Sequence, residues 1–246
     1  MKKLLLSASI VLLATGAFAQ NTMTGSDARF GIKAGVNLAR FHSSGTDGST
    51  SFNDNAKDNV GFNVTAFADF GVGNNFFIQP GVSLQNKGTK SESNSSATVG
   101  ANTITTAVTN KINLMAIEVP VNAVFRIPTG NAGAVQISAG PYIGFNISGK
   151  TKQESSVTTL NNNTNTSTVA NRSDENDLKF GSSNDKDFSG TEFGANFGLA
   201  YRTNSGFLVG ANYGLGLSNL IPKDSRGNSD AKLTNRVLGF TVGYSF

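Results

Sequence analysis

The sequence predicts an all-β protein, an eight-stranded antiparallel up-and-down transmembrane β-barrel with short periplasmic turns and long extracellular loops. Three observations predict it. Eight segments alternate between apolar residues and small or polar residues, the connections between them alternate long and short, and the chain ends on an aromatic residue, Phe246. Alternation with a period of two suits a membrane barrel, because lipid-facing and lumen-facing positions exchange at every residue.

The chain begins with the pattern of a secretory signal peptide. Lys2 and Lys3 precede a short apolar run, and Ala17-Phe18-Ala19 is a small-x-small cleavage site. The alternative, a membrane anchor, needs about 20 apolar residues, and residues 4–14 are too few. We therefore expect a signal peptide at residues 1–19 and a single barrel domain at residues 20–246.

Composition excludes several classes of function. Of the 20 Lys and Arg, Lys2 and Lys3 leave with the signal, so 18 stand against 16 Asp and Glu and are scattered, which predicts no nucleic-acid surface. The chain has no Cys and a single histidine, His42. Disulfides and thiolate chemistry are therefore excluded, and we expect no metal site and no cofactor.

The first three strands are expected at residues 30–41, 60–71 and 76–87. In the first, Lys33, Gly35 and Asn37 occupy the alternate positions that carry polar or small residues, here called the polar parity. The other two strands follow the same rule. Residues 42–59 form a polar loop, whereas the short link 71–75, rich in Gly and Asn, predicts a hairpin.

The fourth and fifth strands are expected at residues 112–127 and 135–148, after a Ser, Thr and Asn-rich loop at 88–111. A turn at 128–133 joins them. Pro120 and Pro141 fall inside these strands, and since a closed barrel has no edges to accommodate proline, we expect them at bulges or frayed ends.

The longest connection, residues 149–190, is predicted to be an irregular outer loop, because its polar composition cannot bury much apolar surface. The sixth and seventh strands, 191–202 and 207–217, flank a turn at 203–206. A polar loop at 218–235 precedes the last strand, 236–246, where Leu238, Phe240 and Val242 alternate with glycine and threonine.

The loop lengths set the orientation. With an even number of strands and both ends of the mature chain in the periplasm, the three short turns are periplasmic and the four long loops are extracellular. The alternative is a secreted lipocalin-like barrel with its apolar parity inward. The small, uncharged residues of the polar parity favour the membrane barrel, because a water-exposed barrel surface would carry more Lys and Glu.

Six charged residues fall on the inward parity: Lys33, Asp69, Glu118, Arg126, Glu192 and Arg202. A lone charge in a lumen filled by side chains costs on the order of several kcal/mol, so we expect these residues to pair with one another or with inward asparagines. Strand direction places all but the two glutamates toward the periplasmic end, and Lys33 with Asp69 is the favoured pair. We interpret the set as a structural plug rather than an ion pathway.

No catalytic motif is found. His42 stands beside Ser43 and Ser44, with Asp47 close by, at the level where outer-membrane hydrolases carry catalytic residues. One histidine in a serine-rich loop does not define a nucleophile, a base and an orienting group. We predict that the protein is not an enzyme.

Several segments resemble the PorT-like outer-membrane β-barrel family, whose members are eight-stranded barrels of the OmpA and OmpX type. They are Gly31-Ile-Lys-Ala-Gly-Val-Asn-Leu38, Ile117-Glu-Val-Pro120, Gly140-Pro-Tyr-Ile-Gly-Phe145, Asn212-Tyr-Gly-Leu-Gly-Leu-Ser-Asn219 and Leu238-Gly-Phe-Thr-Val-Gly-Tyr-Ser-Phe246. The resemblance implies an outer-membrane location and no catalytic residues. After the Glu-x-Pro, where the family often has Leu-Leu-Leu-Lys, this chain has Val121-Asn-Ala-Val124. This departure argues against assigning the founding member's role in protein secretion to this chain.

Three functional hypotheses follow. The first is a non-enzymatic, monomeric barrel with a filled lumen, whose outer loops contact partners or surroundings. The second is an accessory component of an outer-membrane secretion or transport machine, and the third is an outer-membrane enzyme. The expected partners are outer-membrane lipid and the barrel-insertion machinery, which would recognise Phe246 and Tyr244 on the last strand as an assembly signal.

Overall fold

The computed structural model describes residues 28–46, 48–227 and 229–246, so the predicted signal peptide lies outside the described residues. Two short helices, α2 (Ser49–Asn55) and the 3₁₀ helix η1 (Lys223–Ser225), lie among the strands. The strands are β1 (Arg29–Ser44), β2 (Ala56–Lys57), β3 (Asn59–Gly71), β4 (Phe76–Val99), β5 (Asn102–Pro128), β6 (Gly133–Asn161), β7 (Thr166–Asp177), β8 (Thr191–Thr203), β9 (Phe207–Gly216) and β10 (Lys232–Ser245).

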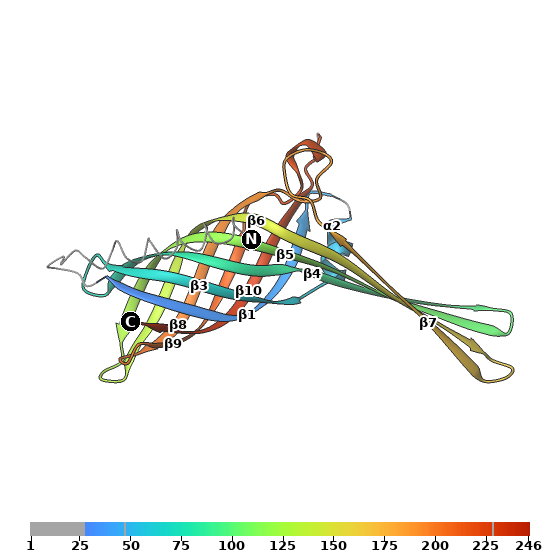
Figure 1. The fold of residues 1–246 in the computed structure, drawn as a ribbon, viewed down its shortest axis with the longest axis horizontal. Helices are drawn as coiled ribbons and strands as arrows, with labels where there is room; N and C mark the ends of the chain where they lie inside the picture. The colour runs from blue at the N-terminus through green and yellow to red at the C-terminus, as the bar shows by residue number, and fades with distance from the viewer. Residues whose placement is uncertain (1–27, 47, 228) are drawn as a thin grey trace, which may run out of the picture.

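Eight of these strands form a closed antiparallel barrel, which confirms the predicted fold class. Around the ring the order is β1, β3, β4, β5, β6, β8, β9, β10, and β1 pairs with β10 from Gly31↔Ser245 to Ser44↔Lys232 to close it (Figure 1). The three short turns lie at one end, here the short-turn end, and the long connections lie at the other, the outer end. The described residues hold no helix long and apolar enough to cross a membrane.

The two faces of the barrel wall separate as the alternation predicts. Outward apolar side chains such as Ile32, Val60 and Val242 are 48%, 68% and 65% exposed, whereas the charged and amide side chains of the other parity are mostly buried in the lumen. A band of exposed apolar side chains around a closed sheet is the surface that lipid covers.

The prolines do not create the predicted bulges. The register shift between β5 and β6 falls at Met115/Ala116. Near Pro141 the ladder continues in the same register but skips two residue pairs, between Pro120↔Tyr142 and Ala123↔Ala139. Proline has no N–H to donate, so the hydrogen-bond ladder breaks locally while the register is kept.

The predicted irregular loops at 88–111 and 149–190 are the main correction. β4 and β5 stay paired out to Val99↔Asn102, β5 and β6 to Asn102↔Asn161, and β7 pairs with β6 from Lys150↔Asp177 to Asn161↔Thr166. The result is a four-stranded antiparallel sheet that projects beyond the barrel (Figure 1), here called the outer sheet (residues 88–111 and 150–177). Composition missed it because barrel strands supply ready-made register for the Thr- and Val-containing chain that continues them.

An apolar cluster closes the barrel at its outer end. Phe41, Leu114, Phe188 and Leu220 are buried together, and the rings of Phe41 and Phe188 lie 5.6 Å apart. Two connections, residues 178–190 and 217–231, supply part of it, joined where the Ser189 amide donates to the Leu220 carbonyl at 2.7 Å. This apolar cap (Phe41, Leu114, Phe188, Leu220) separates the lumen from the outer sheet.

Candidate functional site

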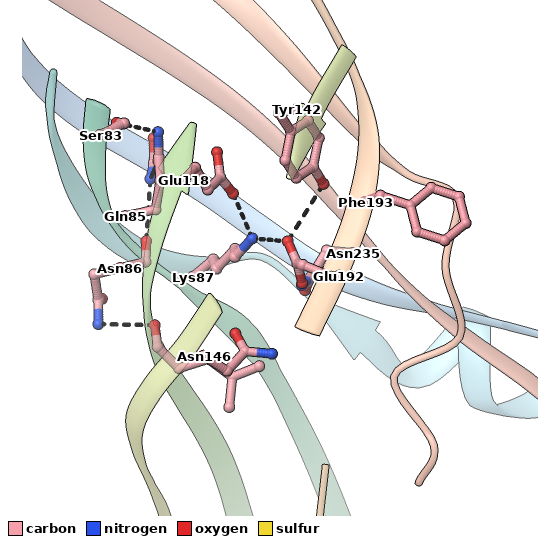
Figure 2. A network of polar contacts seen from close by, with 12 residues as sticks. Ser83, Gln85, Asn86, Lys87, Glu118, Tyr142, Asn146, Glu192, Phe193 and Asn235 are labelled. Carbon is pink, nitrogen blue, oxygen red and sulfur yellow. Dashed lines mark hydrogen bonds and ion pairs between the residues drawn. The ribbon is translucent and has the colours of Figure 1, made fainter. Parts of the chain in front are cut away.

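A buried lysine, Lys87 on β4, holds the upper part of the lumen. Its Nζ donates to Glu118 Oε1 at 2.6 Å and also to Glu192 Oε1, and its side chain is 1% exposed (Figure 2). Glu192 further accepts hydrogen bonds from Tyr142 Oη at 3.3 Å and Asn235 Nδ2 at 2.8 Å. Five strands, β4, β5, β6, β8 and β10, are thereby tied together across the lumen.

A second network lies near the short-turn end. The Arg126 guanidinium is paired with Asp69, and Gln79 Nε2 donates to the other Asp69 oxygen at 2.7 Å. Arg126 also stacks on the ring of Phe77, with 3.8 Å from Cζ to the ring centroid. The predicted pairing of Lys33 with Asp69 is therefore wrong, since Arg126 is paired with that carboxylate.

Two inward cations have no carboxylate partner among the described residues. Lys33 places its Nζ 5.7 Å from the centroid of the Phe67 ring. Arg202 makes no ion pair within the described part of the chain, and its Nε is buried without a hydrogen-bond partner. With Lys87 included, the lumen holds four cations, Lys33, Lys87, Arg126 and Arg202, against three carboxylates. The expected balance of charge is thus replaced by a positive surplus.

Two small cavities lie in the lumen between these networks, in the part of the chain that the structure describes. Two polar cavities of about 50 Å³ each lie beside Lys33. The Asn122 carbonyl and the Gln136 amide are buried there without protein partners, and each cavity has room for a few water molecules. Cavities of this size with an apolar cap above them provide no wide path for solute.

Lys87 is the site residue that sequence reasoning missed. It shares the odd parity of Gln79, Ser83 and Gln85, all inward on the same strand. The prediction ended the strand at this residue and did not include it among the six inward charges. The parity pattern carried the signal that would have placed it in the lumen.

His42 does not form a catalytic pair in the described residues. Its carbonyl accepts a hydrogen bond from Thr234 at 3.4 Å, while Ser43 Oγ lies 3.3 Å from Ser49 Oγ. Asp47 lies outside the described residues. No serine of the described residues is hydrogen-bonded to the imidazole.

The base of the outer sheet carries a ladder of ion pairs. Glu92 is held by Lys57 at 2.5 Å and by Lys90, and these hydrogen bonds lower the pKa of Glu92 to about 2. Farther around the sheet, Lys111 and Lys152 hold Glu154, and Lys150 holds Glu175 at 2.5 Å. Beyond this ladder, residues 93–110 and 155–171 contain no Lys, Arg, Asp or Glu.

The two predicted assembly residues lie at the barrel seam. The Phe246 amide donates to the Phe30 carbonyl at 2.8 Å, and the Phe246 side chain is 75% exposed on the outward face. Tyr244 packs edge-on between Phe207 and Phe246, with ring centroids 5.3 Å apart in both pairs. The aromatic rings face outward, where lipid or an assembly factor can reach them.

The closed ring, the apolar outer face and the filled polar lumen together define an outer-membrane β-barrel protein. A family model described as an outer membrane protein beta-barrel domain matches residues 18–222. The chain belongs to this family, and its place is therefore the outer membrane.

Solved outer-membrane barrels are similar to this chain at low identity. The attachment invasion locus protein Ail of Yersinia pestis is 13% identical, with 89% of this chain and 99% of that chain covered and a TM-score of 0.39. Neisserial surface protein A is 12% identical, with 89% and 99% covered and a TM-score of 0.35. CarO of Acinetobacter baumannii is 11% identical, with 86% and 98% covered and a TM-score of 0.31. No curated protein matches the chain.

Proposed function

We propose that this protein is a non-enzymatic surface-contact protein whose working part is the outer sheet, held above the membrane by a barrel with a filled lumen. The observation that carries the proposal is the open edge of that sheet. In the described residues, β7 has β6 as its only strand neighbour, and β2 covers β4 only as far as Ser91. Unpaired backbone N–H and C=O groups on such edges can pair with an extended segment of another chain.

The charge distribution supports this function. Edge strands are commonly protected by lysine, proline or bulges, yet the distal part of the outer sheet has no charged residue. Its side chains are mainly Ser, Thr and Asn, with cross-strand contacts such as Thr98 to Thr103 at 3.2 Å. The charged side chains lie at the base of the sheet, so the tip presents none.

Edge-blocking variants test the proposal on cells. The full-length protein, displayed by a non-adherent strain, should bind those cells to plates coated with reduced and alkylated α-lactalbumin, an unfolded polypeptide, more than to plates coated with native α-lactalbumin. Lysines at Ser167, Val169 and Asn171 on β7 should abolish the difference. Lysines at Ile104, Thr106 and Val108, on the interior strand β5, add the same charge and should leave the difference in binding unchanged. If the β7 variant bound the unfolded α-lactalbumin as well as the parent does, edge pairing would be refuted.

A second candidate, an accessory component of a secretion or transport machine, follows from the PorT-like resemblance and from the closed lumen. A barrel without a wide path can serve transport only as an accessory to another protein. The glutamate of the resembling Ile117-Glu-Val-Pro120 segment is buried against Lys87, so its side chain faces the lumen. Mild detergent extraction tests the idea: a stable stoichiometric complex supports machinery, and an isolated monomer supports the stand-alone protein.

A further inference from the structure

The periplasmic mouth of the barrel carries a group of three arginines, of which only Arg126 has an ion-pair partner among the described residues. Arg29, Arg126 and Arg202 line one open pocket of about 760 Å³ formed by the short turns, together with Asn74, Asn75 and Asn204. The pocket is separate from the two small lumen cavities and lies at the opposite end from the outer sheet. It is therefore independent of the proposed contact function.

Among the described side chains, Asp69 is the carboxylate of this region, and it is already engaged. Arg126 and Gln79 occupy its two oxygens, so it is not free to neutralise Arg202. Arg126 and Arg29 line the same pocket as Arg202, so three like charges share one space. Within the described residues, three guanidinium groups therefore face one carboxylate.

Arg202 is buried and unsatisfied at this mouth. The residue is 8% exposed and its Nε has no hydrogen-bond partner; Arg126, 7% exposed, has the same deficit at its own Nε. A buried cation without a counterion is destabilising unless some anion or water compensates it. Guanidinium groups match the geometry of phosphate oxygens and bind them with paired charge-assisted hydrogen bonds.

We propose that this pocket, the arginine mouth (Arg29, Arg126, Arg202), is a binding site for a phosphate group on the periplasmic side. The surplus of two positive charges suits a doubly charged phosphate better than a single carboxylate. Arg202 and Arg29 supply the free donors, while Arg126 is held in place by Asp69 and Phe77. The phosphate can belong to a soluble periplasmic compound or to an inner-leaflet phospholipid headgroup, since the pocket opens at that level.

Calorimetric titration of the purified barrel, folded in phosphatidylcholine nanodiscs at low ionic strength, with inorganic phosphate tests the proposal. Arg202→Gln should weaken binding about 10- to 100-fold, the loss expected for a charge-assisted hydrogen bond. Arg40→Gln, which removes an exposed arginine paired with Asp58 on the outer side, should bind as the parent does. Heat-modifiable migration on a denaturing gel confirms that each variant is folded.

Two further arms complete the test. If Arg202→Gln does not fold, Arg29→Gln, at the exposed first residue of β1, takes its place and should show the same direction of loss. Nanodiscs that contain phosphatidic acid distinguish the sources: competition with inorganic phosphate assigns the site to a lipid headgroup, and undiminished binding assigns it to a soluble phosphate. No measurable phosphate binding by the parent, or an equal loss in Arg40→Gln, overturns the proposal.

Discussion

Replacing Lys87 by methionine gives the sharpest test of the lumen interpretation. The change removes the one cation that is bonded to both Glu118 and Glu192, and it leaves two carboxylates facing each other in a buried space. Breaking a buried ion pair by removing one partner costs about 3–5 kcal/mol, because the remaining charge stays desolvated. With a urea dependence of about 2 kcal/mol/M, the unfolding midpoint should fall by about 1.5–2.5 M.

The matched variants separate charge from packing. Lys87→Met combined with Glu118→Gln and Glu192→Gln removes the whole charged group while keeping similar volume, so most of the lost stability should return. Lys150→Met, which breaks the exposed pair with Glu175 on the outer sheet, should leave the midpoint unchanged, because exposed pairs contribute little.

The assay must suit this chain, which has no tryptophan. Urea unfolding in phosphatidylcholine vesicles can be followed by far-UV circular dichroism and by the shift of the folded band on an unheated denaturing gel. A midpoint shift for Lys87→Met below about 0.5 M, which corresponds to about 1 kcal/mol, would refute the reasoning. A triple variant no more stable than Lys87→Met would also refute it.

Three further predictions concern the seam, the lumen and the outer sheet. Deleting Phe246 should slow membrane insertion by purified insertion machinery while leaving the urea midpoint nearly unchanged, because its side chain is 75% exposed and it adds one backbone hydrogen bond; unchanged insertion kinetics would contradict the assembly role. Planar bilayers with reconstituted protein should show no large, steady conductance steps, since the lumen cavities measure about 50 Å³ each; regular large steps would overturn the filled lumen. The folded-state pKa of Glu92 is depressed to about 2, so its ion pairs add stability above its unfolded pKa of about 4.3 and lose it as pH falls through about 2. Carbon NMR of the Glu92 carboxyl should place its midpoint near 2, Lys57→Gln should raise it, and a midpoint near 4.3 in the parent would be the contrary result.

The barrel could be predicted from the sequence because the alternation that marks each strand lies within that strand. Parity along each strand, with Ile32 and Val60 on one side and Lys33 and Asn63 on the other, needs no knowledge of neighbouring strands. Turn residues and connection lengths then set the strand number and orientation. The same parity rule also places Lys87, the last residue of the third predicted strand, in the lumen.

Pairing in the lumen could not be predicted, because it depends on the stagger of the strands. Lys33 and Asp69 are on neighbouring strands, yet Lys33 is opposite Thr65 and Asp69 is opposite Arg29. Arg126 comes from β5 and reaches Asp69 across the lumen. Adjacency in the sheet gave the wrong partner, since tilt and register decide which side chains meet inside a barrel.

The outer sheet was missed for a different reason. Polar composition predicts disorder when a segment must order itself alone, but these strands continue from barrel strands that already share a register. Each added residue pair therefore needs no new nucleation and only has to offset its own ordering entropy. The ion pairs of Lys57, Lys90 and Glu92 lie at the base, where the edge of the sheet meets the barrel rim.

We expect the two ends of the barrel to bind their ligands independently, because two packed layers lie between them. The apolar cap (Phe41, Leu114, Phe188, Leu220) and the Lys87 network stand between the outer sheet and the arginine mouth. A ligand bound at one end could change binding at the other end only if the side chains of both layers rearranged. The small lumen cavities leave no space for such a rearrangement. Phosphate at the mouth should therefore leave the edge pairing of the outer sheet unchanged, and edge-lysine variants should titrate phosphate as the parent does.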